Sequence, residues 1–126
     1  MKIIMKKKEV IELIAKRIAK MEGFGRRTSI AARHNNPGNL RAWGTFPVVK
    51  GFAVFPDAET GWRALRKQIQ VNIDRNLSFY EFFAGKPGVY PGYAPVEDGN
   101  NSLNYAVFVA SAFDVSASTV IRKLIK

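Results

Sequence analysis

The stretch KEVIELIAKRIAKMEGFG, residues 8–25, decides how the fold begins. Isoleucines at positions 11, 14 and 18 recur at the spacing of one helix face, which predicts a helix from residue 8 to residue 21 or 22. Gly23 and Gly25 follow directly, and glycine readily adopts the left-handed conformation that ends helices. The stretch therefore predicts an amphipathic helix with a defined C-terminal end.

Glu22 stands at this end, on the same side as the isoleucines, whereas Lys16 and Lys20 occupy the opposite side. A carboxyl group that is partly buried against apolar surface has a raised pKa, which a general acid needs near neutral pH. The alternative is a helix-end glutamate that faces solvent or pairs with Arg26 or Arg27. Periodicity alone favours this alternative.

The segments after the first helix predict a small β element and a second long helix. Residues 35–39 read NNPGN, a turn, and the segments 40–43 and 52–55 are expected to form a hairpin or a small sheet. Asp57 is expected to cap a helix that reaches about residue 74 and buries Trp62 and Leu65.

The last third of the chain predicts two further helices separated by a loop. The sequence Ser78-Phe79-Tyr80-Glu81 has the capping-box pattern and predicts a short helix that ends at Ala84. Residues 85–101 are rich in Gly, Pro, Asn and Asp and predict a loop. Residues 102–113 predict a helix whose inward face contains Leu103, Ala106, Val107 and Ala110. The expected fold class is α+β, mostly helical.

Composition limits the range of functions. A length of 126 residues fits one domain, 1–126, and residues 1–8 form a basic N-terminal extension. There is no cysteine and only one histidine, so no metal site and no cofactor are expected. No signal peptide and no transmembrane segment are recognisable. The 20 Lys and Arg against 10 Asp and Glu favour a polyanionic partner: nucleic acid, anionic lipid or acidic cell-wall polymers.

Two segments are candidates for binding carbohydrate. The amides of the turn 35–39 could hydrogen-bond sugar hydroxyl and acetamido groups, although a plain tight turn explains them equally well. The loop 90–101 combines tyrosines with Asn100 and Asn101, and aromatic rings with amides suit the apolar faces and polar edges of sugars. Tyr93-Ala94-Pro95 could instead simply pin the loop to the core.

Five segments stand in order along the chain: Met21-Glu22-Gly23-Phe24, Arg33 to Arg41, Gly51 to Phe55, Glu59 to Leu65, and Tyr93-Ala94-Pro95 with Asp98 to Asn101 and Tyr105. Together they resemble a family of phage-encoded lysozyme-like proteins, the lytic transglycosylases and virion-associated muramidases. The resemblance implies a lysozyme-like fold in which Glu22 is the catalytic acid. It also implies sugar-binding roles for Asn36, Asn39 and Tyr93, and Asn101 and Tyr105 of the same ordered motif are further candidates for substrate binding.

The activity implied by this resemblance is cleavage of the β-1,4 bond between N-acetylmuramic acid and N-acetylglucosamine in peptidoglycan. A hydrolase needs water or a second carboxylate, for which Asp57, Glu59 and Asp98 are candidates, whereas a transglycosylase uses the muramic acid's own hydroxyl. The expected partners are glycan strands and an anionic cell envelope that contacts the basic N-terminal face, which includes Lys6, Lys7 and Lys8. Without a signal peptide, the protein is expected to be made in the cytoplasm and to act from a virion or after release to the periplasmic wall.

Two alternatives remain at this point. The first is a non-catalytic virion structural or wall-binding protein on the same fold. The second is a basic nucleic-acid-binding protein, although the sequence contains no recognisable nucleic-acid-binding module and no specific nucleic-acid partner is expected.

Overall fold

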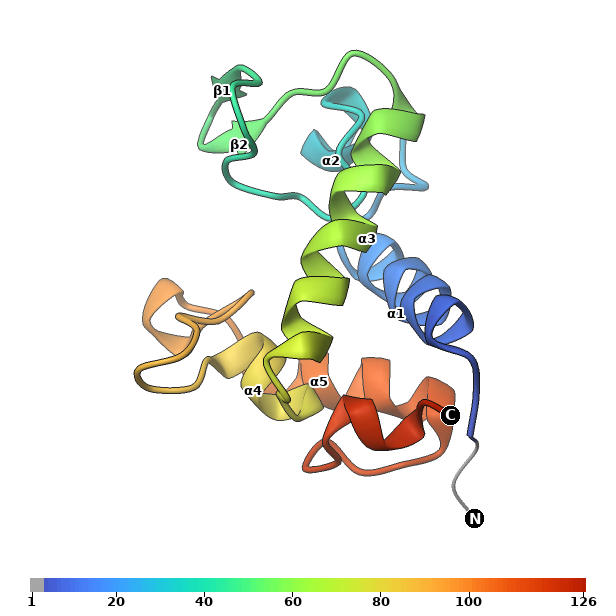
Figure 1. Ribbon diagram of the computed structural model, residues 1–126. Helices are drawn as coiled ribbons and strands as arrows, with labels where there is room; N and C mark the ends of the chain where they lie inside the picture. The colour runs from blue at the N-terminus through green and yellow to red at the C-terminus, as the bar shows by residue number, and fades with distance from the viewer. Residues whose placement is uncertain (1–3) are drawn as a thin grey trace. The chain divides into compact units, whose positions relative to one another are not determined.

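The computed structural model describes residues 4–126, and internal contacts divide this chain into two compact units (Figure 1). Unit 1 consists of residues 4–14 and 70–126, and unit 2 consists of residues 15–69. Helices α1 (Lys7–Met21) and α3 (Ala58–Asp74) each run from one unit into the other. The described chain is mostly helical with one small antiparallel sheet, which confirms the α+β class.

Helix α1 ends as the sequence predicts. Gly23 has a φ of 73°, and its N–H donates to the Lys20 carbonyl at 3.2 Å. The Phe24 N–H donates to the Ala19 carbonyl at 3.0 Å. This pair of bonds is the Schellman pattern, in which a left-handed residue turns the chain out of the helix. Glu22 is the residue directly before that turn.

A short helix that the sequence analysis missed follows. Helix α2 (Ile30–Arg33) is capped by Ser29, whose Oγ accepts the Ala32 N–H at 3.0 Å. The same hydroxyl donates to the Gly23 carbonyl at 2.7 Å. One serine thus joins the end of α1 to the start of α2, and its N-cap position was the signal in the sequence.

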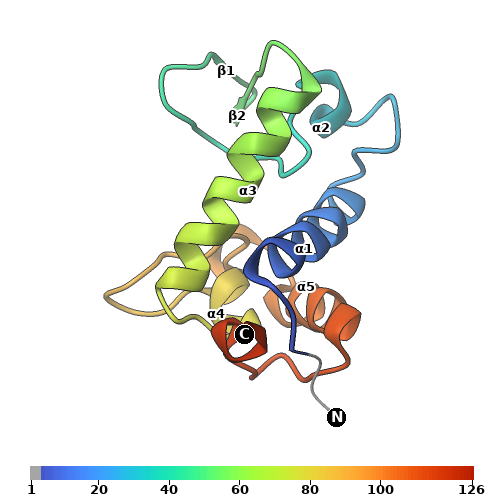
Figure 2. The same ribbon diagram turned by 45° about the vertical axis from the view of Figure 1, so that its right-hand side comes forward.

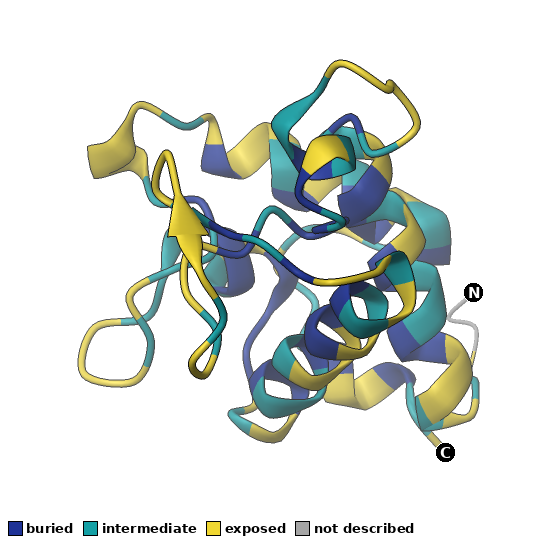
Figure 3. Cartoon of the chain, turned by 90° about the horizontal axis from the view of Figure 1, so that it is seen from above, coloured by how far each residue is buried: buried dark blue, intermediate teal, exposed yellow. Residues whose placement is uncertain are grey.

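The hairpin consists of β1 (Val48–Val49) and β2 (Phe52–Ala53), joined by Lys50 and Gly51. Both turn residues have positive φ, 53° and 83°, as a two-residue hairpin of type I′ requires. Its first strand is exposed (Figure 3).

The prediction that residues 40–43 pair as a strand with 52–55 was wrong. Ala53 donates one backbone bond to the Leu40 carbonyl, at 2.9 Å, and residues 40–43 form no strand. The Leu40 N–H is bound to the side chain of Asn36, so it cannot join a ladder of backbone bonds.

Helix α3 begins as predicted. Asp57 Oδ1 accepts the Thr60 N–H at 2.8 Å and the Thr60 hydroxyl at 2.7 Å. The buried stripe of α3 contains Leu65, Ile69 and Ile73, each at most 1% exposed. Trp62 is only half-buried, and its ring meets Phe24 edge to face at 5.5 Å.

In unit 1, α4 (Phe79–Ala84) lies beside α5 (Ser102–Ala110), as Figures 1 and 2 both show. The predicted capping box is present: Ser78 Oγ accepts the Glu81 N–H, and the Glu81 carboxylate accepts the Ser78 N–H. Three short 3-10 segments complete the unit. They are η1 (Val96–Asp98), η2 (Ser111–Phe113), which continues the predicted C-terminal helix, and η3 (Ile121–Leu124).

The predicted inward face of α5 was partly wrong. Leu103 and Val107 are 54% and 50% exposed, whereas Ala106, Val109 and Ala110 are fully buried. The sequence of α5 is apolar on several sides, so periodicity could not identify the face that packs. The phenylalanines of α4 and η2 fill this part of the core: Phe79, Phe82, Phe83 and Phe113.

Both ends of the described chain belong to unit 1. The Met5 N–H donates to the Leu124 carbonyl at 2.8 Å, and the Lys126 N–H donates to the Met5 carbonyl at 3.0 Å. Lys7 Nζ lies 2.8 Å from Asp74 Oδ1. Of the predicted basic extension, residues 1–3 lie outside the described residues, and Lys7 already begins α1.

Across residues 4–126, none of the helices combines the length and the apolar character that spanning a membrane requires.

Candidate active site

Glu22 lies at the C-terminal end of α1 and is half-buried. Burial strips water from its carboxyl group and raises the pKa of Glu22 above its ordinary value. A hydrogen bond from the Asn39 amide opposes this rise and lowers the pKa in part. Glu22 therefore has the environment that favours a proton donor near neutral pH.

The side chain of Asn39 makes this contact directly. Its Nδ2 donates to Glu22 Oε2 at 3.2 Å. The Asn39 backbone is left-handed, with a φ of 50°, and its N–H donates to the Asn36 carbonyl at 2.9 Å. Asparagine tolerates this conformation better than most residues. The structure therefore brings together two of the residues that the sequence singled out, Glu22 and Asn39.

Asn36 holds the turn together from inside. Its side chain is 0% exposed, and Nδ2 donates to the carbonyls of Leu40 at 2.9 Å and Ala53 at 3.0 Å. Its Oδ1 accepts the Leu40 N–H at 2.9 Å. This amide uses both of its N–H groups and its oxygen internally. The Asn36 side chain therefore shapes the turn that presents Asn39, and a role of Asn36 in sugar binding stays a prediction.

The turn packs against the first part of α3. Asn35 has a φ of 53°, and its Nδ2 donates to the Phe55 carbonyl at 3.1 Å. At Gly61 of α3, a Cβ atom would collide with the Asn35 carbonyl oxygen and come within 2.8 Å of the Pro37 ring. Only glycine lets helix and turn approach this closely. The glycine at position 61 is thus part of the support for Asn39.

The other carboxylates of unit 2 are engaged elsewhere. Hydrogen bonds from Thr60 hold the pKa of Asp57 below its ordinary value, because they stabilise the ionised form. Glu59 Oε1 lies 3.2 Å from Arg63 on the exposed surface of α3. Asp98, the third candidate for a second catalytic carboxylate, belongs to η1 in unit 1. Glu22 is therefore the carboxylate of unit 2 whose environment favours proton donation.

Positive charge is concentrated in the unit that contains Glu22. Residues 15–69 hold eleven Lys and Arg and three acidic residues, Glu22, Asp57 and Glu59. The rest of the chain holds nine basic and seven acidic residues. The basic residues of unit 2 are Lys16, Arg17, Lys20, Arg26, Arg27, Arg33, Arg41, Lys50, Arg63, Arg66 and Lys67.

Beside the end of α1 lies a hollow of about 580 Å³, lined by residues 19–21 and 23–26. Its polar lining includes Lys20 and Arg26, and Phe24 contributes an aromatic ring. The Arg26 guanidinium lies over Gly23, where it occupies the space that a Cβ atom would need. From the sequence, Arg26 was expected at most to pair with Glu22. Arg26 can take this position only because residue 23 is a glycine.

The remaining predicted sugar-binding residues belong to unit 1. The rings of Tyr93 and Tyr105 both pack against Phe83, with centroids 5.9 and 6.1 Å away. Asn101 is exposed and caps α5, because its Oδ1 accepts the Asn104 N–H at 3.1 Å. The structure thus brings the two tyrosines together around one phenylalanine. Their roles and that of Asn101 in sugar binding stay predictions.

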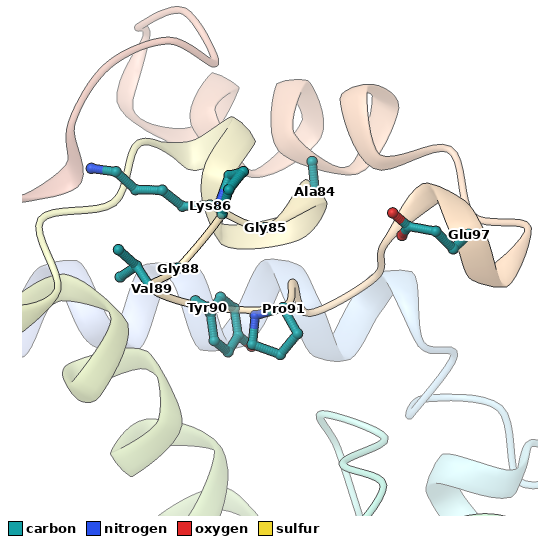
Figure 4. Close-up of a pocket in the computed structure, with 9 residues that line it drawn as sticks. Ala84, Gly85, Lys86, Gly88, Val89, Tyr90, Pro91 and Glu97 are labelled. Carbon is teal, nitrogen blue, oxygen red and sulfur yellow. The ribbon is translucent and has the colours of Figure 1, made fainter.

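A second hollow, of about 470 Å³, is formed by residues 84–91 together with Glu97 (Figure 4). Figure 4 shows Glu97 at one end and Lys86 and Val89 at the other. Burial raises the pKa of Tyr90 above its ordinary value, and the Arg75 guanidinium lies 4.8 Å from the centre of its ring. Arg75 thus covers one face of the Tyr90 ring, so that face cannot stack on a sugar.

His34 is nearly buried, and its carbonyl accepts the Phe55 N–H at 2.9 Å. Among residues 4–126, no three histidine or acidic side chains gather closely enough to hold a metal ion.

In comparisons with known proteins, no family model, no curated protein and no solved structure matches the chain.

Proposed function

We propose that this chain cleaves the β-1,4 bond between N-acetylmuramic acid and N-acetylglucosamine in peptidoglycan, on a lysozyme-like fold, with Glu22 as the general acid. The observation that carries the proposal is the half-buried Glu22 carboxyl, whose pKa is raised by burial and which accepts a hydrogen bond from the Asn39 amide. The ordered sequence segments that resemble phage lysozyme-like proteins support the choice of substrate.

In the proposed reaction, Glu22 gives its proton to the glycosidic oxygen as the bond to the muramic acid C1 breaks and an oxocarbenium-like centre develops. Asp57 caps α3 and Glu59 pairs with Arg63, so neither carboxylate is available as a partner within unit 2. This supports the transglycosylase route. The C6 hydroxyl of the muramic acid then attacks C1, its proton returns to Glu22, and a 1,6-anhydro end forms.

The charge distribution supports an anionic wall as the setting for this reaction. A unit with eleven basic and three acidic residues attracts polymers that carry carboxylate or phosphate groups. The docking surface expected at Lys6, Lys7 and Lys8 is less suitable, because Lys7 is paired with Asp74. We therefore place wall docking on unit 2. Delivery from a virion, or by release to the periplasmic wall, is part of the same proposal.

The test is mass spectrometry of purified peptidoglycan after incubation with the wild type, Glu22→Gln and Glu59→Gln. Glu59→Gln is the matched control, because it makes the same change at an exposed carboxylate of the same unit. We expect anhydro ends with the wild type and Glu59→Gln, and a loss of at least about a hundredfold with Glu22→Gln, the usual scale of general-acid catalysis.

Each alternative has its own outcome in this experiment. Reducing ends would mean hydrolysis through water, with Glu22 still the acid. Wall binding without products would identify a non-catalytic wall-binding protein. Equal product from the wild type and Glu22→Gln would refute the catalytic assignment. Nucleic-acid binding that survives near-physiological salt, with no action on walls, would favour the nucleic-acid-binding alternative.

A further inference from the structure

The Asn39 amide has one polar atom in contact with Glu22 and one without a partner. Its Nδ2 donates to Glu22 Oε2 at 3.2 Å. Its Oδ1 is buried and has no hydrogen-bond partner among the described residues. A buried amide oxygen without a donor is energetically unfavourable, because it has lost the hydrogen bond that water would give it. That cost is recovered whenever a donor becomes available to it.

Hydrogen bonds hold the backbone of the turn in place on both sides of the Asn39 side chain. The Asn39 N–H is bound to the Asn36 carbonyl, and the next N–H, that of Leu40, is bound to Asn36 Oδ1. Glycine would fit the φ of 50° at lower cost than asparagine. What asparagine adds at this position is therefore the amide itself.

A half-turn of that amide exchanges its donor and its acceptor. An ionised Glu22 can only accept, and the Nδ2–H group serves it. A protonated Glu22 carries an O–H donor, and the amide oxygen can accept it. We infer that Asn39 is the positioning residue of Glu22, donating to the carboxylate and, after a half-turn, accepting from the carboxylic acid.

This inference rests on the proposed function, in which Glu22 passes through both protonation states in each turnover. The charged residues nearest to this contact along the chain are Lys20 and Arg26 beside Glu22, and Arg41 beside Asn39. Burial and the Asn39 hydrogen bond are the two causes of the altered Glu22 pKa. The bond to the ionised carboxylate is the stronger of the two, because one of its partners carries a charge. Removing the amide should therefore raise the Glu22 pKa.

The test is a carbon-13 NMR titration of the Glu22 carboxyl in the folded protein, with Glu22→Gln used to assign its signal. Asn39→Gly keeps the left-handed backbone and removes the amide. Asn39→Asp keeps the shape, but it replaces the donor with a second carboxylate. We expect the Glu22 pKa to rise in both variants, more in Asn39→Asp, because like charges oppose ionisation.

The pH profile of peptidoglycan cleavage provides the second readout. A general acid loses activity as pH rises through its pKa, so the basic limb of the profile should move to higher pH in Asn39→Gly. The maximal rate should fall by about tenfold to a hundredfold, because the carboxyl is no longer held in place.

The two proposals fail separately. An unchanged Glu22 pKa in both variants would overturn the inference about Asn39, whatever the activity. A shifted pKa in a protein that never cleaves peptidoglycan would support the coupling and overturn the proposed function.

Discussion

Replacing Asn36 with alanine should weaken the fold of unit 2 more than any other single amide substitution in the turn. The change removes both amide donors and the acceptor from a side chain that is 0% exposed. The Leu40 carbonyl keeps a partner, the Ala53 N–H. The Leu40 N–H and the Ala53 carbonyl lose the amide that binds them. At about 1–3 kcal/mol for each buried unpaired group, the loss is about 2–6 kcal/mol. Total stabilities of about 5–15 kcal/mol make this a large fraction.

Urea unfolding followed by tryptophan fluorescence measures this loss. Both tryptophans, Trp43 and Trp62, belong to residues 15–69, so their emission reports on unit 2. Asn104→Ala is the control, because Asn104 is an exposed amide of α5, where substitutions usually change stability by less than about 0.5 kcal/mol. If Asn36→Ala also lost less than about 0.5 kcal/mol, the argument that this amide holds the turn would be refuted.

Three further predictions concern the same unit. Glu22→Gln should raise the melting temperature at neutral pH but not in acid. The pKa of Glu22 is higher in the folded protein, so the wild type loses stability as the pH rises through that pKa. Calorimetry between about pH 4 and pH 8 measures this, and a difference in melting temperature between variant and wild type that stays constant with pH would contradict it. Gly61→Ala should cost about 1–3 kcal/mol in urea unfolding, although alanine normally stabilises helices, and a stabilised variant would contradict the close packing. Reversing the charge of exposed Lys16 and Lys20 should weaken co-sedimentation with anionic walls, most strongly at low salt, and a loss independent of salt would argue against electrostatic docking.

The sequence predicted the helices well because their signals are local. The isoleucine spacing of α1 and the caps at Asp57 and Ser78 each depend on residues within a few positions of one another. Gly23 ended α1 where its conformational freedom predicts. Such features need no knowledge of distant parts of the chain.

The sheet and the turn were harder because their bonds join distant residues. The segment at Leu40 looks like a strand, but a side chain four residues earlier takes its N–H. Asn36 and Asn39 look alike in sequence, yet one amide is fully buried and the other meets Glu22, seventeen residues away. Residue type cannot predict which asparagine is buried and which contacts Glu22, since this depends on the side of the turn that each residue occupies.

The bond between Met5 and the segment that ends at Lys126 has a consequence for biosynthesis. Unit 2 is one continuous stretch, so all of its residues are synthesised before the second segment of unit 1. Unit 1 is interrupted by it, and its first segment must wait for Leu124 before the two ends can pair. Because chains begin to fold from the N-terminal side during synthesis, the unit that contains Glu22 can form while unit 1 still lacks its last residues. A ribosome stalled before residue 120 should therefore already carry a folded Glu22 turn.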